Sequence, residues 1–359
     1  MAFFAALSRH VLLIGLAVMV AGCGDMPAPR PRLGSIPYPG MLNLFELCDP
    51  LVLGEHQYEI FVGPGNEVEH CVMYVCKAGF LDVTHIRDTV DLAHYTQVRL
   101  ERELLAGRTR FLLPTGVPSV LHISLQYPVF WKDLDSREKA RTAHELSIVM
   151  AERLAFLMGT WHEALQWMGY KSSVLFGEDR SAFTYDDTMS HMVGVMVASI
   201  ALRGTKHGYD EAVTIAMREV IDELGPVSMA QASQAIRLVE GKWWQDGDSL
   251  KRYLDVGLDN DTIRAWLVPG LSACPALRPP SYSLPSMADV AGRNFSNFYT
   301  VGIEPRIAEA SWLDRIFGRQ PALLDVKTDL PRVMAGIRKE MAATMGPDMD
   351  NPEAAPSGR

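Results

Sequence analysis

Apolar and polar positions along the chain predict a helix-rich fold with a few short strands. Apolar residues recur at helical spacing from Thr84 to Leu105 and from Ser136 to Phe156. Gly159-Thr160 is expected to end the second of these helices, and a short helix is expected at 161–168. Further helices are predicted at 209–224, 229–241, 248–256 and 330–345.

Strands are predicted where short apolar or β-branched runs are bounded by glycine and proline. Residues 58–62 and 71–76 form two such runs, and Gly63-Pro64-Gly65-Asn66 supplies a turn between them. Residues 117–127 predict another strand, in which Pro118 fits only near the start. A late strand is expected at 298–303.

A buried helix is predicted after residue 187. Thr184 is followed three residues later by Asp187, an acidic variant of a capping box. The run from Met192 to Arg203 is nearly all apolar or small, which indicates a helix packed closely on most sides. At about 12 residues it is shorter than the roughly 20 that a membrane span needs.

These elements together predict an α+β fold dominated by helices. We expect a bundle of helices with a small antiparallel sheet from the N-terminal part, in a single globular domain over residues 40–345. Residues 346–359 are rich in Pro, Asp, Glu and Ser and are expected to be a disordered tail. No repeat of fixed period is present.

The N-terminus has the pattern of a lipoprotein signal peptide. Residues 11–22 are apolar or small, too short for a span, and Val20-Ala21-Gly22-Cys23 resembles the bacterial lipobox. The resemblance implies a signal peptide at 1–22, lipidation (palmitate and diacylglycerol) of Cys23, and a Pro-rich tether at 23–39. A plain secretory signal is the alternative. Because aspartate stands at position 25 rather than 24, we expect delivery to the outer membrane, facing the periplasm.

The net charge bears on possible partners of the protein, and the number of cysteines bears on its disulfide bonds. The formal net charge of −9 argues against a nucleic-acid partner. Four cysteines remain besides Cys23, and an even number in an oxidising periplasm suggests two disulfides. We favour Cys71–Cys76 with Cys48–Cys274. The alternative is that Cys76 is a free nucleophile.

Candidate chemistry is concentrated in three polar clusters, at residues 82–91, 159–170 and 181–187. If the first is helical, His85 and Asp88 lie three apart on one face, as do Asp88 and Asp91. His162 and Glu163 stand among Gly, Trp and Tyr, a setting that suits the wall of a cleft. There is no HExxH motif, because His162-Glu163 is followed by Ala-Leu-Gln.

The first two clusters predict a site for a divalent metal such as zinc. The expected ligands are His85, Asp91, His162 and Glu163, and Asp187 is a further possibility. Glu163 would be a ligand or the general base, His85 and His162 ligands or acid/base groups, and Asp88 or Asp91 an orienting group. His144-Glu145 lies 18 residues before His162, roughly 27 Å along one straight helix, and cannot share that metal.

The same residues also have structural interpretations. Arg87 with Asp88 and Asp91 could form an ion-pair group on a helix surface, and Asp186-Asp187 could do no more than start a helix. His162 could be a half-buried histidine packed on Trp161.

Several separated motifs resemble an uncharacterised family of bacterial envelope proteins, domain of unknown function 4056. The motifs are the lipobox, Leu53-Gly54-Glu55-His56-Gln57-Tyr58, the segment 74–87, Trp161-His162-Glu163 and Phe183-Thr184-Tyr185-Asp186-Asp187. The resemblance covers about residues 40–310 and implies that these motifs belong to one domain. It implies no activity, and no family role is carried onto His191, which is left out of the site.

Two hypotheses of function follow. In the first, the chain is a membrane-anchored envelope hydrolase that acts on an envelope lipid, glycan or peptide, with or without a metal. In the second, it is a binding or assembly lipoprotein with a partner in the cell envelope, and the polar clusters are structural. The membrane is the expected partner through the lipid anchor in both cases.

Overall fold

The computed structural model describes residues 26–29, 47–58, 71–115, 119–170, 180–275 and 278–354. These residues contain seven helices and ten short strands. The helices are α2 (Val83–Leu105), α3 (Ser136–Trp167), α4 (Asp187–Ala201), α5 (Tyr209–Leu224), α6 (Met229–Val239), α7 (Ile307–Phe317) and α8 (Leu330–Met345). The strands are β1 (Val72–Val75), β2 (Gly79–Asp82), β3 (Arg110–Pro114), β4 (Val120–Leu125), β5 (Trp244–Gln245), β6 (Asp248–Ser249), β7 (Thr262–Arg264), β8 (Ser281–Ser283), β9 (Tyr299–Glu304) and β10 (Leu324–Asp325).

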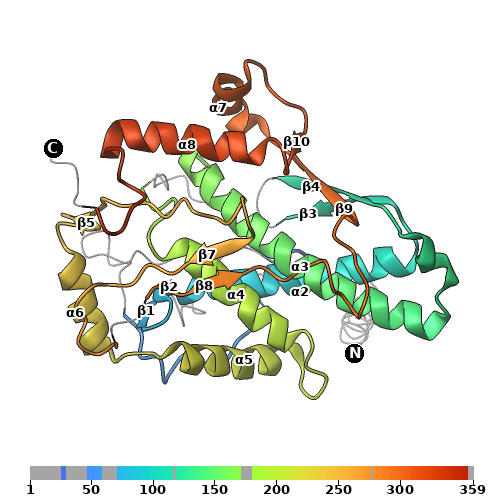
Figure 1. Ribbon diagram of the computed structural model, residues 1–359, viewed down its shortest axis with the longest axis horizontal. Helices are drawn as coiled ribbons and strands as arrows, with labels where there is room; N and C mark the ends of the chain where they lie inside the picture. The colour runs from blue at the N-terminus through green and yellow to red at the C-terminus, as the bar shows by residue number, and fades with distance from the viewer. Residues whose placement is uncertain are drawn as a thin grey trace, which may run out of the picture.

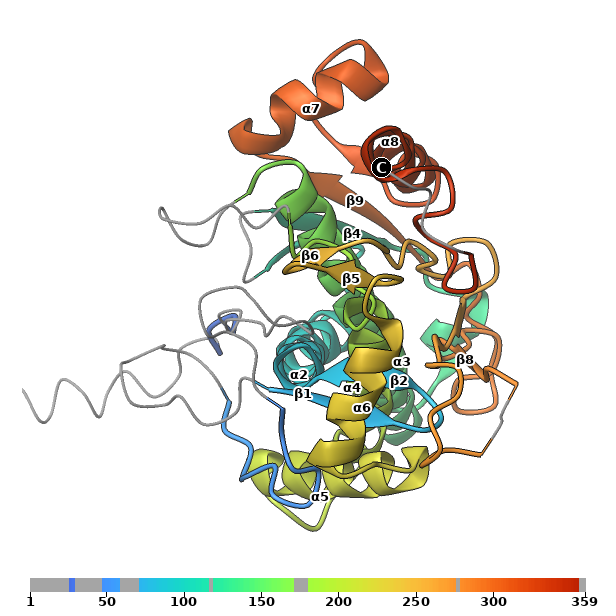
Figure 2. The ribbon, with the colours of Figure 1, turned by 90° about the vertical axis from the view of Figure 1, so that its left-hand side faces the viewer.

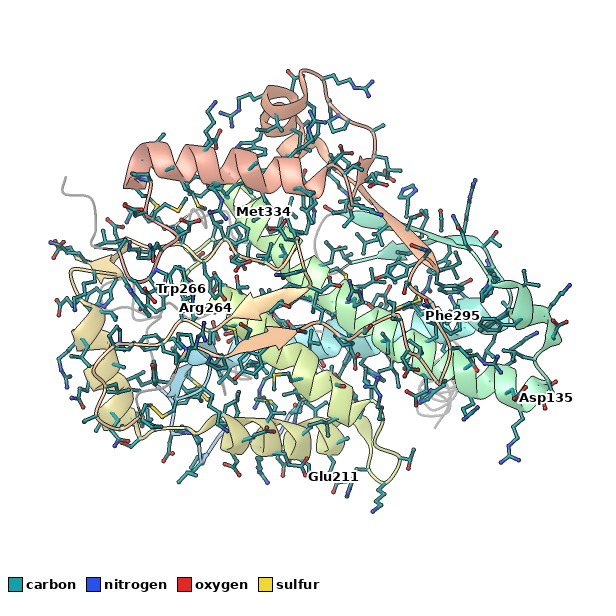
Figure 3. The ribbon with its side chains drawn as sticks, in the orientation of Figure 1. Asp135, Glu211, Arg264, Trp266, Phe295 and Met334 are labelled. Carbon is teal, nitrogen blue, oxygen red and sulfur yellow. A yellow bond between two sulfur atoms is a disulfide. The ribbon has the colours of Figure 1, made fainter. Side chains whose placement is uncertain are left out.

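Helix α4 lies at the centre of the helical part and contacts α2, α3 and α5 (Figures 1 and 2). Its residues are buried around most of its circumference, as the apolar run predicts. Helix α8 lies across one end of α3, with Met334 pointing inward, and Glu211 on α5 lies at the outer surface (Figure 3). Three helices therefore bring their side chains to the surface of α4.

Helix α3 is continuous, so the expected break at Gly159-Thr160 is wrong. Gly159 serves a close contact between helices, because a Cβ there would lie 2.6 Å from Nδ1 of His191 on α4. Gly194 does the same between α4 and α2, where a Cβ would lie 2.6 Å from Cβ of Thr89. The two glycines allow α2, α3 and α4 to approach more closely than larger residues would permit.

The fold class is confirmed as a helix-dominated α+β fold with small antiparallel sheets. The largest sheet has the strand order β10-β9-β4-β3 and combines strands from the middle and the end of the chain. β1 and β2 form the small N-terminal sheet, with Val72 opposite Asp82. The expected pairing of residues 71–76 with 58–62 cannot be followed, because 59–70 lie outside the described residues.

Residues 250–256 form neither a helix nor a strand, so the helix expected at 248–256 is wrong. Their amides donate to carbonyls from distant parts of the chain: Lys251 to Trp243, Arg252 to Met349 and Tyr253 to Phe183. These long-range hydrogen bonds replace the local ones of a helix. The segment thereby connects the turn before α4 with the C-terminal residues.

The C-terminal residues up to 354 pack against the body, although a disordered tail was expected from residue 346. Met349 is buried, and the carbonyl oxygen of Pro352 accepts from the indole of Trp243. The ammonium group of Lys251 donates to the carbonyl oxygen of Asp348. None of the described helices is both long and apolar enough to cross a bilayer.

Two disulfides are present, as expected, but the favoured pairing is wrong. Cys48 bonds to Cys71 and Cys76 bonds to Cys274, with Cα–Cα distances of 5.4 and 5.3 Å. Cys71 and Cys76 stand at opposite ends of strand β1, and five extended residues span roughly 16 Å, more than twice what a disulfide can bridge. The bond to Cys274 also excludes Cys76 as a free nucleophile.

Candidate metal centre

Three helices bring two imidazoles and a carboxylate to one point. His85 projects from the first turn of α2, Glu163 from α3 and His191 from α4. Oε1 of Glu163 lies 4.0 Å from Nε2 of His85 and 3.8 Å from Nε2 of His191. One ligand atom from each residue lies within 4.8 Å of the other two, and these three form the single such cluster in the part of the chain that is described.

Two of these atoms are buried without a hydrogen-bond partner. Nε2 of His191 and Oε1 of Glu163 are both inaccessible to solvent and make no hydrogen bond within the described structure. A buried polar atom without a partner costs about 1–3 kcal/mol, more if it is charged. Two such atoms that face each other at 3.8 Å indicate a shared ligand, and a cation satisfies both at once.

A hydrogen bond to Thr89 fixes the tautomer of His191. The Thr89 hydroxyl donates its only proton to the carbonyl oxygen of His85, at 2.8 Å. It can therefore only accept from Nδ1 of His191, which lies 2.9 Å away. With the proton on Nδ1, the lone pair is on Nε2 and points toward Glu163, as a metal-binding histidine requires.

The second oxygen of Glu163 is held by the turn before α4. The amide of Phe183 donates to Oε2 at 2.9 Å. Phe183 has a φ of 56°, a left-handed conformation uncommon for a residue with a side chain. Arg252 stabilises this turn by donating to the carbonyl oxygens of Arg180 and Ala182, and Tyr253 donates to that of Phe183.

Asp187 adds a second carboxylate at the edge of the cluster. Its Oδ1 lies 3.3 Å from Nε2 of His85, and the amide of Thr184 donates to its Oδ2 at 2.6 Å. Of the predicted capping box, the structure therefore contains the hydrogen bond from the Thr184 amide to the Asp187 carboxylate. The hydroxyl of Thr184 donates to the carboxylates of Asp186 and Asp187. The same carboxylate that starts α4 also faces His85.

Asp82 and Ser190 fix the start of α2 against α4. The side chain of Asp82 caps α2 by accepting from the amide of Thr84 at 2.7 Å. Its own amide donates to the hydroxyl of Ser190, which donates in turn to the carbonyl oxygen of Asp186. His85, in the first turn after this cap, is held in register with α4.

Burial and mutual charge shift the pKa values of the cluster. Burial raises the pKa of Glu163, and burial together with the charge of Glu163 raises the pKa of Asp187 to about 6. Burial lowers the pKa of His191 to about 3. Burial also acts to lower the pKa of His85, but its hydrogen bond to Asp187 and the surrounding carboxylates raise it well above the usual value. A bound cation would take the place of the His85 proton.

His162 lies beside the cluster. Burial, with the charges of His85 and His191, lowers the pKa of His162 to about 3. Its Nδ1 is buried without a hydrogen-bond partner among the described residues, and its Nε2 lies 3.2 Å from the amide nitrogen of Gln166. His162 is therefore neutral and offers one polar atom that the protein does not satisfy.

Asp91 and Asp88, the other two expected site residues, are not part of the cluster. Oδ1 of Asp91 accepts from Nε2 of His56 at 2.9 Å and from the Tyr209 hydroxyl at 2.6 Å. Six residues rotate a helix by roughly 240°, so Asp91 and His85 face different sides of α2. Asp88 is half-buried and supplies no atom to the cluster. Arg87 is buried and donates to the carbonyl oxygens of Leu53 and Glu55.

His191 is the member of the cluster that sequence reasoning left out. It follows Asp187 by four residues, which places both side chains on one face of α4. This four-residue spacing, in a helix rich in small residues, is the feature of the sequence from which His191 could have been included in the site. Cys23, the expected lipidation site, lies outside the described residues.

Comparison with known proteins identifies a family but no activity. The family model described as "Protein of unknown function (DUF4056)" matches residues 27–255. The chain belongs to this family. The match includes α2, α3 and α4, and hence the three residues of the cluster and Asp187, and it ends before β7. Neither the curated proteins nor the solved structures include a significant match to the chain.

Proposed function

We propose that the chain is a metal-dependent hydrolase of the bacterial cell envelope. The observation that carries this proposal is the pair of buried, unpartnered atoms, His191 Nε2 and Glu163 Oε1, with His85 Nε2 beside them. Two imidazoles and one carboxylate from three elements are a ligand set of catalytic zinc sites, in which the fourth position holds water. Zinc is therefore the first candidate for the metal.

The neighbouring groups suit hydrolysis. When bound, the metal would supply a Lewis acid that makes its water nucleophilic at neutral pH. Asp187 lies next to His85, where its carboxylate could hold a proton, while Glu163 would hold the metal through Oε1 because the amide of Phe183 occupies its other oxygen. His162 lies beside these residues and is kept neutral by burial.

The location is part of the proposal and is supported by two observations. The lipobox at Cys23 implies a lipid anchor, and two disulfides fit an oxidising compartment such as the periplasm. We propose an outer-membrane lipoprotein that faces the periplasm and acts on an envelope lipid, glycan or peptide.

Metal analysis of the purified full-length protein tests the proposal. We expect about one equivalent of zinc in the wild type and none in Glu163→Gln or His191→Asn. His122→Gln is the matched control, because His122 forms an exposed pair with Glu304 at 2.7 Å outside the cluster. Absence of stoichiometric metal, with stability unchanged by a chelator, would overturn the metal site and favour a binding or assembly lipoprotein.

Activity is tested separately with the loaded protein. Isolated cell-envelope material is incubated with the wild type and with Glu163→Gln, and new fragments are sought by mass spectrometry. Products that depend on Glu163 and on the metal support hydrolysis. If a stoichiometric metal is present and neither lipid, glycan nor peptide is cleaved, the metal is structural and the hydrolase proposal is wrong.

A further inference from the structure

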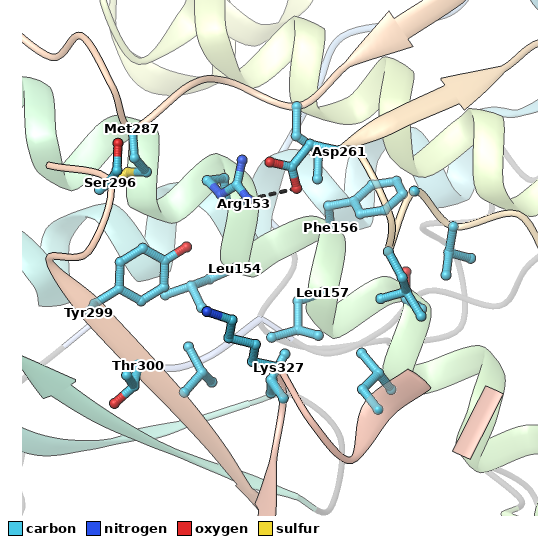
Figure 4. A pocket seen from close by; sticks show the side chains of 18 of the residues that line it. Arg153, Leu154, Phe156, Leu157, Asp261, Met287, Ser296, Tyr299, Thr300 and Lys327 are labelled. Atoms are coloured by element: carbon cyan, nitrogen blue, oxygen red, sulfur yellow. Dashed lines mark hydrogen bonds and ion pairs between the residues drawn. The ribbon is translucent and has the colours of Figure 1, made fainter. Parts of the chain in front are cut away.

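A second candidate site is a pocket between α3 and the C-terminal part of the chain (Figure 4). Its volume is about 880 Å³, within the range of small-molecule sites. None of His85, Glu163, Asp187 and His191 lines it. One wall is formed by α3, and most of the rest by residues 256–331, which lie beyond the family match.

The pocket wall carries many uncharged polar side chains. Hydroxyl and amide groups lie around it at Asn260, Ser283, Ser286, Ser296, Asn297 and Thr300. Such groups both donate and accept hydrogen bonds, as the hydroxyl and acetamido groups of a sugar do. Apolar side chains such as Leu154 and Leu157 are also present, and they give the ring faces of a sugar a surface to lie on.

Arg153 is a fixed part of this wall. Its guanidinium donates to Oδ1 of Asp261 at 2.7 Å and to the carbonyl oxygen of Pro285 at 2.9 Å. The pair neutralises the charge of Asp261. The other acidic residue of the wall, Asp325, accepts from the amide and hydroxyl of Thr328.

Lys327 is the charged group of the wall that the protein leaves unpaired. Its side chain extends across the pocket and brings its ammonium group between Tyr299 and Leu154 (Figure 4). Among the described residues it has neither a hydrogen bond nor an ion pair. Arg153 is already paired with Asp261, and the carboxylate of Asp325 is held by the neutral Thr328, so Lys327 is the cation of the wall that is available to the carboxylate of a ligand.

We propose that this pocket binds an acidic glycan, whose hydroxyl and acetamido groups meet the polar wall and whose carboxylate meets Lys327. The site is separate from the metal centre and does not depend on it. Because its wall lies largely outside the matched region, it adds a binding function to this chain that the family domain alone does not contain.

Two disaccharides that differ in one carboxylate test the proposal. N-acetylglucosaminyl-N-acetylmuramic acid carries a lactyl carboxylate, and chitobiose has the same type of backbone without it. Titration calorimetry with the full-length protein is expected to show saturable binding of the first and weaker binding of the second. Lys327→Gln should weaken binding of the acidic sugar about tenfold and leave chitobiose unaffected.

Lys339→Gln is the matched control, because Lys339 is an exposed lysine on α8 that does not line the pocket. It should bind both sugars like the wild type. Glu163→Gln should also bind the acidic sugar normally, which separates this site from the metal centre. No saturable binding of the acidic sugar, or equal affinity in wild type and Lys327→Gln, overturns the proposal.

Discussion

His191 donates a hydrogen bond of 2.9 Å from Nδ1 to the hydroxyl of Thr89, so that its Nε2 lone pair faces Glu163. Thr89 is on α2 and His191 on α4, and the bond joins the two helices at the candidate metal centre. Thr89 is not one of the three candidate ligands. It acts by orienting a ligand, and this role can be tested apart from the ligands themselves.

Replacing Thr89 by valine keeps the shape of the side chain and removes the acceptor. The His191 ring is then free to change tautomer, and we expect zinc affinity to fall by about 10–100-fold. A competition titration with a chromophoric chelator measures the change. Thr96→Val is the control, because the Thr96 hydroxyl on the same helix is buried without a partner in the described structure. Equal affinity in Thr89→Val and wild type would contradict the assigned tautomer.

Replacing Gly159 by alanine is expected to destabilise the protein. In an ordinary helix interior the change stabilises by about 0.5–1 kcal/mol. Here the new Cβ would lie 2.6–2.8 Å from three ring atoms of His191 and would displace it. We predict a lower melting temperature and loss of metal in Gly159→Ala. Gly208→Ala serves as the control, since nothing lies within 4 Å of its Cβ position. A stabilised Gly159→Ala that still binds metal would show that the contact is looser than described.

Acid should destabilise the folded protein partly through His94. Burial lowers the pKa of His94, whose ring stacks on Tyr209 at 3.9 Å between centroids. The unfolded chain binds the proton more readily, so the stability that neutral His94 contributes is present above about pH 6.5 and is lost as the pH falls below it. Asp91, Asp210 and His56 also act on this ring, and the two aspartates reduce the shift.

The measurement for His94 is the slope of unfolding free energy against pH between 7 and 5. His94→Gln should have a shallower slope than the wild type, even if its stability at pH 7 is lower through loss of stacking. Parallel curves for His94→Gln and wild type would mean that His94 takes up its proton equally well in both states.

The two disulfides should contribute unequally to stability. The Cys76–Cys274 bond closes a loop of 198 residues and the Cys48–Cys71 bond one of 23. In the chain-entropy model this difference alone makes the longer bond more stabilising by about 2 kcal/mol. Urea denaturation of the two double Cys→Ala variants compares them. A larger loss from the Cys48/Cys71 variant would indicate that native packing, not loop closure, dominates.

The sequence pattern within a segment was sufficient to predict those helices whose defining features lie within that segment. The bounds of α5 and α8 were predicted, because their apolar periodicity and flanking turns are contained within each segment. The segment at 250–256 was not, since its hydrogen bonds come from Phe183 and Met349, far away in the sequence. The local sequence predicts a helix break at Gly159, because it does not show that this glycine makes a close contact with His191 of another helix.

The site was predicted only in part for a related reason. His85 and Glu163 stand in polar surroundings that attract attention, whereas His191 lies in an apolar helix. The distance between α2 and α4, which makes His191 a neighbour of His85, is set by Gly194 and Thr89 and becomes evident only when the helices are packed. Asp91 resembled a ligand by residue type but faces another side of its helix.

A contact between Pro27 and the body of the protein limits the distance from the body to Cys23. The hydroxyl of Tyr58 donates to the carbonyl oxygen of Pro27, and the ring of Tyr58 lies edge-on against His94 and Tyr209. Three residues stand between Cys23 and Pro27, and the four Cα–Cα steps reach at most roughly 14 Å. If Cys23 carries the proposed acyl group, it would therefore hold the body against the bilayer surface, and the proposed hydrolase would reach only substrates that lie at the membrane.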